Sequence, residues 1–431
     1  MSQSDARELQ NRRLQEIAAF AYKSSLFYKK LFKQHKIDIR NIKCIEDLKE
    51  LPFTCPQDLI QYPLEFRTSD DSVSIIYCSG GTIGQPKILF YTREDLETIH
   101  NAIAGMLFMC GIRPSDTIAL MQPFGIYFIG DSHSEGYRRI GAKIIPIGIY
   151  INDRYAVHLI KYLQATVIDT CPSLLYRITN EAMDQGLDPS GDFNVKRILL
   201  AGESIKDQQR TFFTNKWNAN VFNIYGSAET SIIATECFMH NGLHFFQDRL
   251  IAEVLDPVSN EPVKYGETGE LVLTTLTHHG TPLLRYRIGD LVRFIGDRCK
   301  CGRTYPLLLV EGRLDEVLTL SYGIKFYAYQ IDRAFQDFRD QLQEYQVVCD
   351  YEKGKDVVLF VVESTESADK NELKKNVLEA IDNISIDFVE AIDGKSIDVD
   401  VKVVKPMTIP RTERGKIVRF VDRRTHTGER K

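Results

Sequence analysis

The chain has 431 residues, of which 43% are apolar and 26% are charged, and its formal net charge at pH 7 is -5. This composition is typical of a globular protein, and the length favours two domains over a single core. The charge gives no reason to expect nucleic acid as the main partner, and the longest apolar run, at residues 102–112, is shorter than the roughly 20 residues that cross a bilayer.

The chain begins with a polar segment of mixed charge, which predicts neither a signal peptide nor a transit peptide. Its nine cysteines are scattered and odd in number, unlike a secreted disulfide framework. We therefore expect a cytoplasmic protein that contacts no membrane and is either a monomer or a homodimer.

The predicted elements of the first half indicate a layered α/β fold. Residues 6–35 have apolar positions at near-helical spacing, which predicts helical structure over this range. From about residue 73, β-rich runs alternate with helical stretches, which predicts a sheet with helical crossovers. The expected strands are 74–79, 117–123, 142–148, 165–171, 195–202 and 219–226, and the expected helix is 93–109.

A different pattern begins near residue 250, where β-rich runs separated by turns predict an antiparallel β subdomain. After residue 318 the pattern predicts a small α+β unit of roughly a hundred residues, which is the size of an independent domain. We therefore expect a large N-terminal domain, residues 1–314, and a small C-terminal domain, residues 315–431, with Asp315 at the hinge.

Residues 77–87 (YCSGGTIGQPK) follow a predicted strand and form a glycine-rich loop. Glycines let the backbone approach a ligand closely, hydroxyls add hydrogen-bonding groups, and a lysine suits phosphate. The loop is not a Walker A loop, because Lys87 follows Pro86. By itself it is equally compatible with a flexible surface loop. The candidate binding residues are Ser79, Gly80, Gly81, Thr82, Gly84 and Lys87.

Two further polar motifs, residues 201–204 (AGES) and 223–230 (NIYGSAET), each follow an apolar strand. Open α/β sheets bind ligands just beyond the carboxyl ends of their strands. Tyr225 can stack on a purine, Asn223 can read its amino edge, and Glu229 can hold a Mg²⁺ that bridges phosphates. The structural alternative is a core tyrosine followed by an acid in the first turn of a helix.

Three later residues extend this set. Asp290, in LLRYRIGD, has a carboxylate that can accept hydrogen bonds from both hydroxyls of a ribose. Arg313, in GRLDE, is a candidate for a phosphate or ribose contact next to the domain junction. Lys416, in PRTERGK, lies on a polar loop from which a mobile lysine can stabilise charge developing on an α-phosphate.

In their order along the chain, these motifs resemble those of the adenylate-forming superfamily, which includes acyl-CoA synthetases, luciferases and peptide-synthetase adenylation domains. More closely, they resemble the phenylacetate-CoA ligase family, from residues 24–60 to the final RGK. The resemblance implies an N-terminal domain that binds ATP and acid, and a small mobile lid domain that carries the catalytic lysine.

The resemblance also implies a role for each motif residue. Lys416 and Glu229 would be catalytic, with Mg²⁺ on Glu229, and loop 79–87 would close over the phosphates. Asp290 would bind the ribose, and Arg313 the ribose or a phosphate. The residues expected around the adenine and its neighbouring phosphates are Ala201, Gly202, Glu203, Asn223, Tyr225, Gly226 and Ser227.

The implied reaction is ATP-dependent activation of a small carboxylic acid, expected to be an aryl acid, to acyl-AMP, then thioester formation with CoA, releasing AMP and pyrophosphate. An alternative acceptor is the phosphopantetheine of an acyl carrier protein. A non-catalytic nucleotide-binding module is the alternative of another class, because Ala228 stands where the superfamily usually has Ser or Thr. The residues that favour an aryl acid form an aromatic-rich patch: Phe124, Ile126, Tyr127, Phe128 and Tyr137.

Residues 236–244 (ECFMHNGLH) and 299–302 (CKCG) together contain potential metal ligands. Cys237, Cys299, Cys301 and one histidine would make a closed tetrahedral zinc site of the structural kind. The resemblance favours His244 over His240 as the fourth ligand. The alternative is reduced cysteines in a turn beside a hydrogen-bonded histidine. The expected cofactors are therefore ATP, Mg²⁺, CoA and a structural Zn²⁺.

Overall fold

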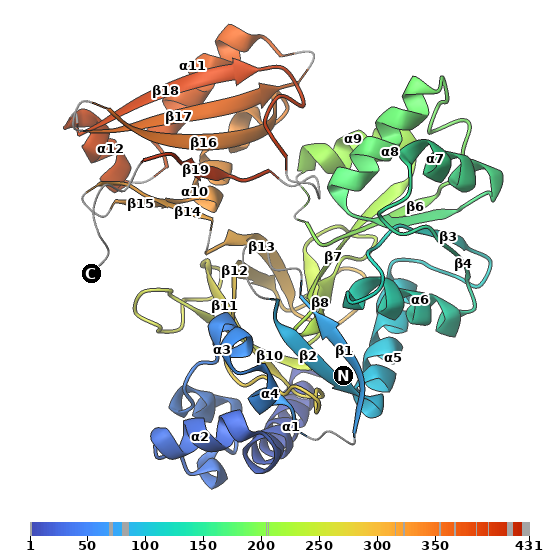
Figure 1. Cartoon of the computed structure of the whole chain (residues 1–431), viewed down its shortest axis with the longest axis vertical. Helices are drawn as coiled ribbons and strands as arrows, with labels where there is room; N and C mark the ends of the chain where they lie inside the picture. Colours follow the sequence, from blue (N-terminus) through green and yellow to red (C-terminus); the bar gives the residue numbers. More distant parts are fainter. Residues whose placement is uncertain are drawn as a thin grey trace. The chain divides into compact units, whose positions relative to one another are not determined.

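The structure is a computed structural model that describes residues 2–68, 72–79, 86–203, 205, 207–314, 316–321, 324–352, 355–365, 368–384, 386–394, 396–411 and 417–424. It divides into two compact units, Met1–Val310 and Glu311–Lys431 (Figure 1).

The large unit begins with helices α1 (Gln3–Ser24), α2 (Leu26–Gln34), α3 (Pro56–Gln61) and α4 (Pro63–Phe66). Ser2 starts α1 through a capping box with Asp5. Ser25 ends α1 and caps α2 with its side chain. The helix expected over residues 6–35 is therefore two helices, because the extended backbone of Ser25 separates them.

These helices are tied to a strand far along the chain. The hydroxyl of the buried Tyr28 lies 3.1 Å from Thr54 Oγ1 and accepts a 2.9 Å hydrogen bond from Leu284 N. Thr54 Oγ1 donates to Leu284 O at 2.8 Å. This buried tie, formed by Tyr28, Thr54 and Leu284, fixes the N-terminal helices against the segment that leads to Asp290.

An 11-stranded sheet forms the centre of the large unit. Its parallel half contains β3 (Thr117–Leu120), β4 (Lys143–Pro146), β5 (Val167–Thr170), β6 (Arg197–Ala201) and β7 (Asn220–Ser227). The other half contains β8 (Ser231–Thr235), β9 (Leu243–Phe245), β10 (Leu250–Leu255), β11 (Gly269–Thr275), β12 (Tyr286–Gly296) and β13 (Leu307–Arg313).

The strand order is β10-β11-β12-β13-β9-β8-β7-β6-β5-β3-β4. The direction changes at β7, which pairs in parallel with β6 and antiparallel with β8. The strands expected after residue 250 do not form a separate β sheet. They continue the parallel sheet, because β8 and β9 connect the two halves.

The two faces of the parallel half contact different helices (Figure 1). Leu199 and Phe222 belong to the core that contains residues of α5 and α6, whereas Leu200 and Val221 belong to the core that contains residues of α7, α8 and α9. This alternation is the period of two expected of a strand. The helices are α5 (Arg93–Met109), α6 (Phe128–Ile140), α7 (Asp153–Tyr162), α8 (Pro172–Asp184) and α9 (Asp207–Trp217).

A separate antiparallel hairpin precedes α5 and brackets the glycine-rich loop. It consists of β1 (Val73–Cys78) and β2 (Ile88–Thr92), with Cys78 opposite Ile88. The loop therefore begins and ends at one end of a two-stranded ribbon.

The small unit has its own core. Its four-stranded sheet has the order β18-β17-β16-β19, formed by β16 (Leu342–Glu352), β17 (Lys355–Ser364), β18 (Ile397–Val404) and β19 (Phe420–Asp422). The other elements are β14 (Val317–Thr319), β15 (Lys325–Tyr327), α10 (Ala328–Ala334), α11 (Lys370–Ile381) and α12 (Ile386–Asp393).

The predicted fold class is confirmed, with a large α/β N-terminal part that contains the 11-stranded sheet and a C-terminal α+β part with a sheet of its own. Among the described residues, no helix is both long enough and apolar enough to cross a membrane.

Candidate active site

The base of the glycine-rich loop is closed by two hydrogen bonds between Ser79 and Lys87. Ser79 N donates to Lys87 O at 3.0 Å, and Lys87 N donates to Ser79 Oγ at 3.3 Å. Ser79 and Lys87 therefore hold the two ends of the loop next to each other. The other predicted loop residues, Gly80, Gly81, Thr82 and Gly84, lie outside the described residues.

The Lys87 ammonium forms an ion pair with Glu229, a residue far away in sequence. Glu229 is only 5% exposed, and its Oε1 also accepts a 3.2 Å hydrogen bond from the hydroxyl of Tyr286. Burial, the largest single effect, raises the pKa of the Glu229 carboxyl, but the Lys87 charge and the hydrogen bonds from Lys87, the backbone and Ser227 together outweigh burial, so the pKa lies below its ordinary value. The site therefore holds a carboxylate rather than a carboxylic acid beside the loop.

The turn that carries Glu229 connects β7 to β8 and is tightly packed. Ser227 Oγ lies 2.9 Å from Thr230 Oγ1 and accepts a 3.2 Å hydrogen bond from Thr230 N. A side chain at Gly226 would meet Ser231 O at 2.7 Å, so this position requires glycine. These contacts fix the direction in which the Glu229 side chain leaves the sheet.

Ala228, the residue that departs from the superfamily pattern, lies against an aromatic cluster. The hydroxyl of Tyr91 donates to Ala228 O. The ring of Tyr91 is stacked on Phe128 with centroids 5.4 Å apart, and Tyr77 lies edge-on to both. The cluster Tyr77–Tyr91–Phe128 therefore stands directly behind the Glu229 turn.

Two residues predicted around the nucleoside are brought together from different strands. The hydroxyl of Tyr225, in β7, donates to Asp290 Oδ2, in β12. Asp290 is 7% exposed. A phenol that holds one carboxylate oxygen orients the carboxyl group, as binding to a ribose requires.

Asn223 is held through its backbone by a residue that we did not predict. Asn223 N donates to Glu236 Oε2 at 2.7 Å, and the Arg210 guanidinium binds both oxygens of Glu236, at 2.9 and 2.6 Å. The bidentate pair fixes the edge of β7 at the Asn223 position. The available sequence signal was an acid directly after the apolar strand SIIAT.

The AGES motif lies where β6 ends. Gly202 has φ of +82°, in the left-handed region that favours glycine. The Glu203 carboxylate accepts hydrogen bonds from Ser173 N, at 3.0 Å, and from Ser173 Oγ, at 2.7 Å. Ala201 is buried at the end of the strand. Glu203 is thus bonded to the start of α8, and this orients the motif.

Of the other predicted residues, Arg313 ends β13 and is exposed. The predicted hinge Asp315 and the predicted catalytic Lys416 lie outside the described residues. Their roles stay predictions.

The predicted metal ligands form one cluster in the large unit. Single ligand atoms of Cys237, His244, Cys299 and Cys301 all lie within 4.8 Å of one another. Cys237 Sγ is 3.7 Å from Cys299 Sγ, and Cys301 Sγ is 3.5 Å from His244 Nε2. His240 lies instead 3.5 Å from Glu236. A tetrahedral ion with Zn–S bonds of about 2.3 Å requires sulfur atoms about 3.8 Å apart, so the group fits zinc.

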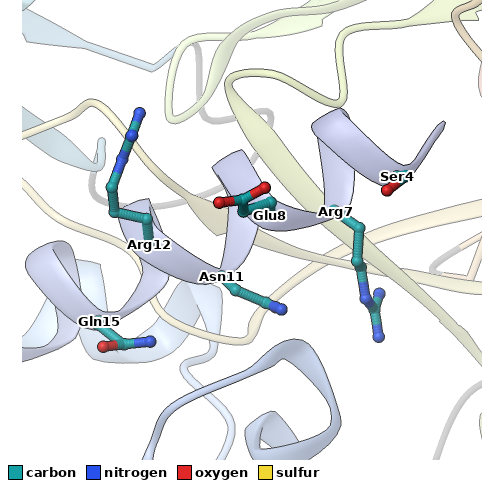
Figure 2. Close-up of a pocket in the computed structure, with 6 residues that line it drawn as sticks. All are labelled: Ser4, Arg7, Glu8, Asn11, Arg12 and Gln15. Atoms are coloured by element: carbon teal, nitrogen blue, oxygen red, sulfur yellow. The ribbon is translucent and has the colours of Figure 1, made fainter. Parts of the chain in front are cut away.

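A pocket on α1 lies apart from these motifs (Figure 2). Three of its lining residues attach the helix to the segment after it. Arg7 pairs with Glu46, Asn11 Oδ1 accepts from Ile45 N at 3.1 Å, and Gln15 donates to Lys43 O at 2.7 Å. The pocket contains no predicted site residue, and we assign it no function. It is lined by Ser4, Arg7, Glu8, Asn11, Arg12 and Gln15.

The fold and the nucleotide motifs define an AMP-binding enzyme, and the chain belongs to this family. The model of the AMP-binding enzyme matches residues 9–276, and the model of the AMP-binding enzyme C-terminal domain matches residues 323–424. The chain is 29% identical to phenylacetate-coenzyme A ligase of Thermus thermophilus, over 97% of this chain and 96% of the relative.

Within this family, the chain is an AMP-forming acid–CoA ligase that resembles phenylacetate-CoA ligase. The Escherichia coli phenylacetate-coenzyme A ligase is 27% identical over 99% of this chain and 97% of its own length. Among solved structures, 2-hydroxyisobutyryl-CoA ligase with 2-HIB-AMP, in the postadenylation state, matches with a TM-score of 0.83 and 25% identity, over 98% of this chain and 90% of that chain.

These matches confirm the predicted family and class of reaction. The chain uses ATP to convert an acid to acyl-AMP and then forms a thioester with CoA. They do not support the alternative of a non-catalytic nucleotide-binding module.

Proposed function

We propose that the acid is a small aryl carboxylic acid and that Mg²⁺·ATP binds between the glycine-rich loop and the Glu229 turn. The observation that carries this proposal is the ion pair of Lys87 with the buried Glu229, with the aromatic cluster Tyr77–Tyr91–Phe128 directly behind it. Charged groups suit the phosphates and the metal, and the adjacent aromatic rings suit an apolar ring.

The names of two relatives support an aryl acid. Beside the phenylacetate-coenzyme A ligases, the chain is 24% identical to indoleacetate–lysine synthetase of Pseudomonas savastanoi, over 81% of this chain and 84% of the relative. The 2-hydroxyisobutyryl-CoA ligase is named for an aliphatic hydroxy acid. A small aliphatic acid is therefore the alternative substrate, and the experiment must distinguish it from an aryl acid.

The proposed chemistry proceeds in two displacements. A carboxylate oxygen of the acid bonds to the α-phosphorus of ATP, and the bond to the β-phosphate oxygen breaks, so that pyrophosphate leaves. The CoA sulfur then bonds to the acyl carbon, its proton passes to solvent, and AMP leaves with the former carboxylate oxygen.

Catalysis rests on position and charge in this proposal, because neither displacement requires a covalent protein intermediate. Glu229 would hold Mg²⁺, which supplies charge neutralisation for the phosphates when bound. Lys87 would contact phosphate, and Asp290, oriented by Tyr225, would hold the ribose. Lys416 would stabilise the charge of the adenylation step.

The test is acid-dependent ATP–pyrophosphate exchange over a panel of aryl, short aliphatic and amino acids. Exchange with aryl acids at a kcat/KM well above that of the aliphatic acids is expected. Exchange with aliphatic acids alone would refute the aryl proposal. Transfer from the adenylate to CoA, compared with transfer to a holo acyl carrier protein, then tests the second acceptor.

We also propose that Cys237, His244, Cys299 and Cys301 bind a structural zinc ion. The group joins the end of β8, β9 and the turn before β13, so zinc would link strands of the antiparallel half. Its donor set of three sulfurs and one imidazole is closed, with no position left for a substrate.

Elemental analysis is expected to find about one zinc per chain, and Cys299→Ser is expected to lose the metal and lower the melting temperature. Cys44→Ser is the matched control, since Cys44 is a free thiol outside the group. A metal-free wild type whose melting temperature does not respond to added zinc would end this proposal.

A further inference from the structure

A polar cluster is buried in the large unit away from the nucleotide motifs. Asp169 is fully buried, and its carboxylate accepts from Gln122 Nε2 at 2.8 Å, from the Tyr137 hydroxyl at 2.7 Å and from His133 Nδ1 at 2.7 Å. His133 is 5% exposed and Tyr137 is fully buried. A buried carboxylate is costly unless it is bonded in this way.

The position of Asp169 places this cluster on one defined face of the sheet. Asp169 pairs in register with Leu120 of β3 and Leu199 of β6, and Leu199 pairs with Phe222 of β7. Residues in register on paired strands point to the same face, so the carboxylate points toward α5 and α6. Ala201, two residues further along β6, points to that face as well.

The same helix connects the cluster to the reacting centre. Phe128, the first residue of α6, stacks on Tyr91, whose hydroxyl is bonded to Ala228 beside Glu229. His133 lies five residues further along α6, which is a rise of about 7.5 Å at 1.5 Å per residue and a rotation of about 140° around the helix axis. This rise is comparable to the length of one aromatic ring with a substituent at its far end.

The bonding of His133 defines what its second nitrogen can recognise. An ionised carboxylate only accepts hydrogen bonds, so Nδ1 carries a proton that it donates to Asp169. When the ring is neutral and Nδ1 is its donor, Nε2 is its acceptor. Among the described residues, His133 Nε2 makes no hydrogen bond, although the ring is almost wholly buried.

We infer that His133, oriented by Asp169 and Tyr137, is a specificity residue that accepts a hydrogen bond from a hydroxyl at the far end of an aryl acid. This inference rests on the proposed aryl function and narrows it to hydroxylated aryl acids. A second carboxylate on the acid would be excluded, because it would place a negative charge beside the Nε2 lone pair and Asp169.

The experiment measures pyrophosphate exchange of the full-length protein with matched acids that differ only by a para hydroxyl. The pairs are phenylacetate with 4-hydroxyphenylacetate, benzoate with 4-hydroxybenzoate, and 3-phenylpropionate with 3-(4-hydroxyphenyl)propionate. In at least one pair, the wild type is expected to prefer the hydroxylated acid by about 100-fold or more in kcat/KM.

Three variants separate recognition from a purely structural role. His133→Phe is expected to abolish the preference, through a loss on the hydroxylated acid alone. His133→Gln is expected to keep part of it, because an amide can donate to Asp169 and still present an oxygen. His158→Phe, at an exposed histidine of α7, is the control. Melting temperatures show whether each variant is folded.

Equal exchange with both members of every pair in the wild type would overturn this inference and leave the aryl function standing. An equal loss on both members in folded His133→Phe would also overturn it. Exchange with aliphatic acids alone would refute the aryl function, and this inference with it. If His133→Phe does not fold, equal kcat/KM for both acids in His133→Gln overturns the inference.

Discussion

Replacing Glu229 with Gln is expected to lower kcat/KM for adenylation by about 100- to 1,000-fold. Gln keeps the volume of the side chain and a group that can accept from Tyr286, but it removes the charge that pairs with Lys87. It also removes the oxygen with which we propose that Mg²⁺ is held. Exchange at increasing Mg²⁺ concentration checks this, and the concentration needed for half-maximal rate should rise.

The control for this variant is Tyr286→Phe, which removes the hydrogen bond to Glu229 Oε1 and leaves the charge of the carboxylate. We expect it to cost much less than Glu229→Gln. Exchange of Glu229→Gln near the wild-type rate, at the same Mg²⁺ concentration, would contradict both the catalytic role and the metal role of Glu229.

Replacing Lys416 with Ala is expected to lower adenylation by about 1,000-fold or more and to leave ATP binding nearly unchanged. The lysine is predicted to act on the charge that develops at the α-phosphate, whereas we propose that the loop and Glu229 hold the nucleotide. Thioester formation from a separately prepared acyl-adenylate should be retained, because the predicted role is confined to the first step. Single-turnover rates of the two half-reactions are the measurement.

Lys375→Ala is the matched control, because Lys375 lies on the surface of the same small unit and is 75% exposed. Its replacement should affect neither half-reaction. Retention of most adenylation in Lys416→Ala would exclude the proposed role. An equal loss in both half-reactions would show that Lys416 contributes to the stability of the protein and not to the adenylation step.

The sequence predicted the strand ends well because apolar runs and the polar motifs after them are local signals. β6 ends at Ala201 and β7 at Ser227, within the predicted motifs. The long-range partners could not be predicted in the same way. Nothing in the spacing of residues 77–87 indicates that Lys87 pairs with Glu229. The ion pair forms because the fold brings the end of the glycine-rich loop next to the turn between β7 and β8.

Two other differences have physical causes. The expected antiparallel β subdomain is present, but it continues the parallel sheet through β8 and β9, because the pairing that joins the two halves depends on topology and has no local sequence signal. Glu236 was missed because it binds a backbone N–H and Arg210, and neither contact has a fixed sequence spacing.

The choice between His240 and His244 was open from spacing alone, since both follow Cys237 closely. His244 lies in β9, whose pairing with β13 sets it near the turn that holds Cys299 and Cys301. His240 has φ of +46° in the turn before that strand. The strand register, which spacing does not reveal, selects the ligand.

The buried tie of Tyr28, Thr54 and Leu284 has a consequence for synthesis on the ribosome. Tyr28 precedes Leu284 by 256 residues, which at about 5 to 20 residues per second is a delay of roughly 13 to 50 s. During that time Tyr28 of α2 lacks the backbone of Leu284, to which its hydroxyl is finally bonded. The nascent chain should therefore bind chaperones early, at its first two helices, and release them only after β12 has emerged.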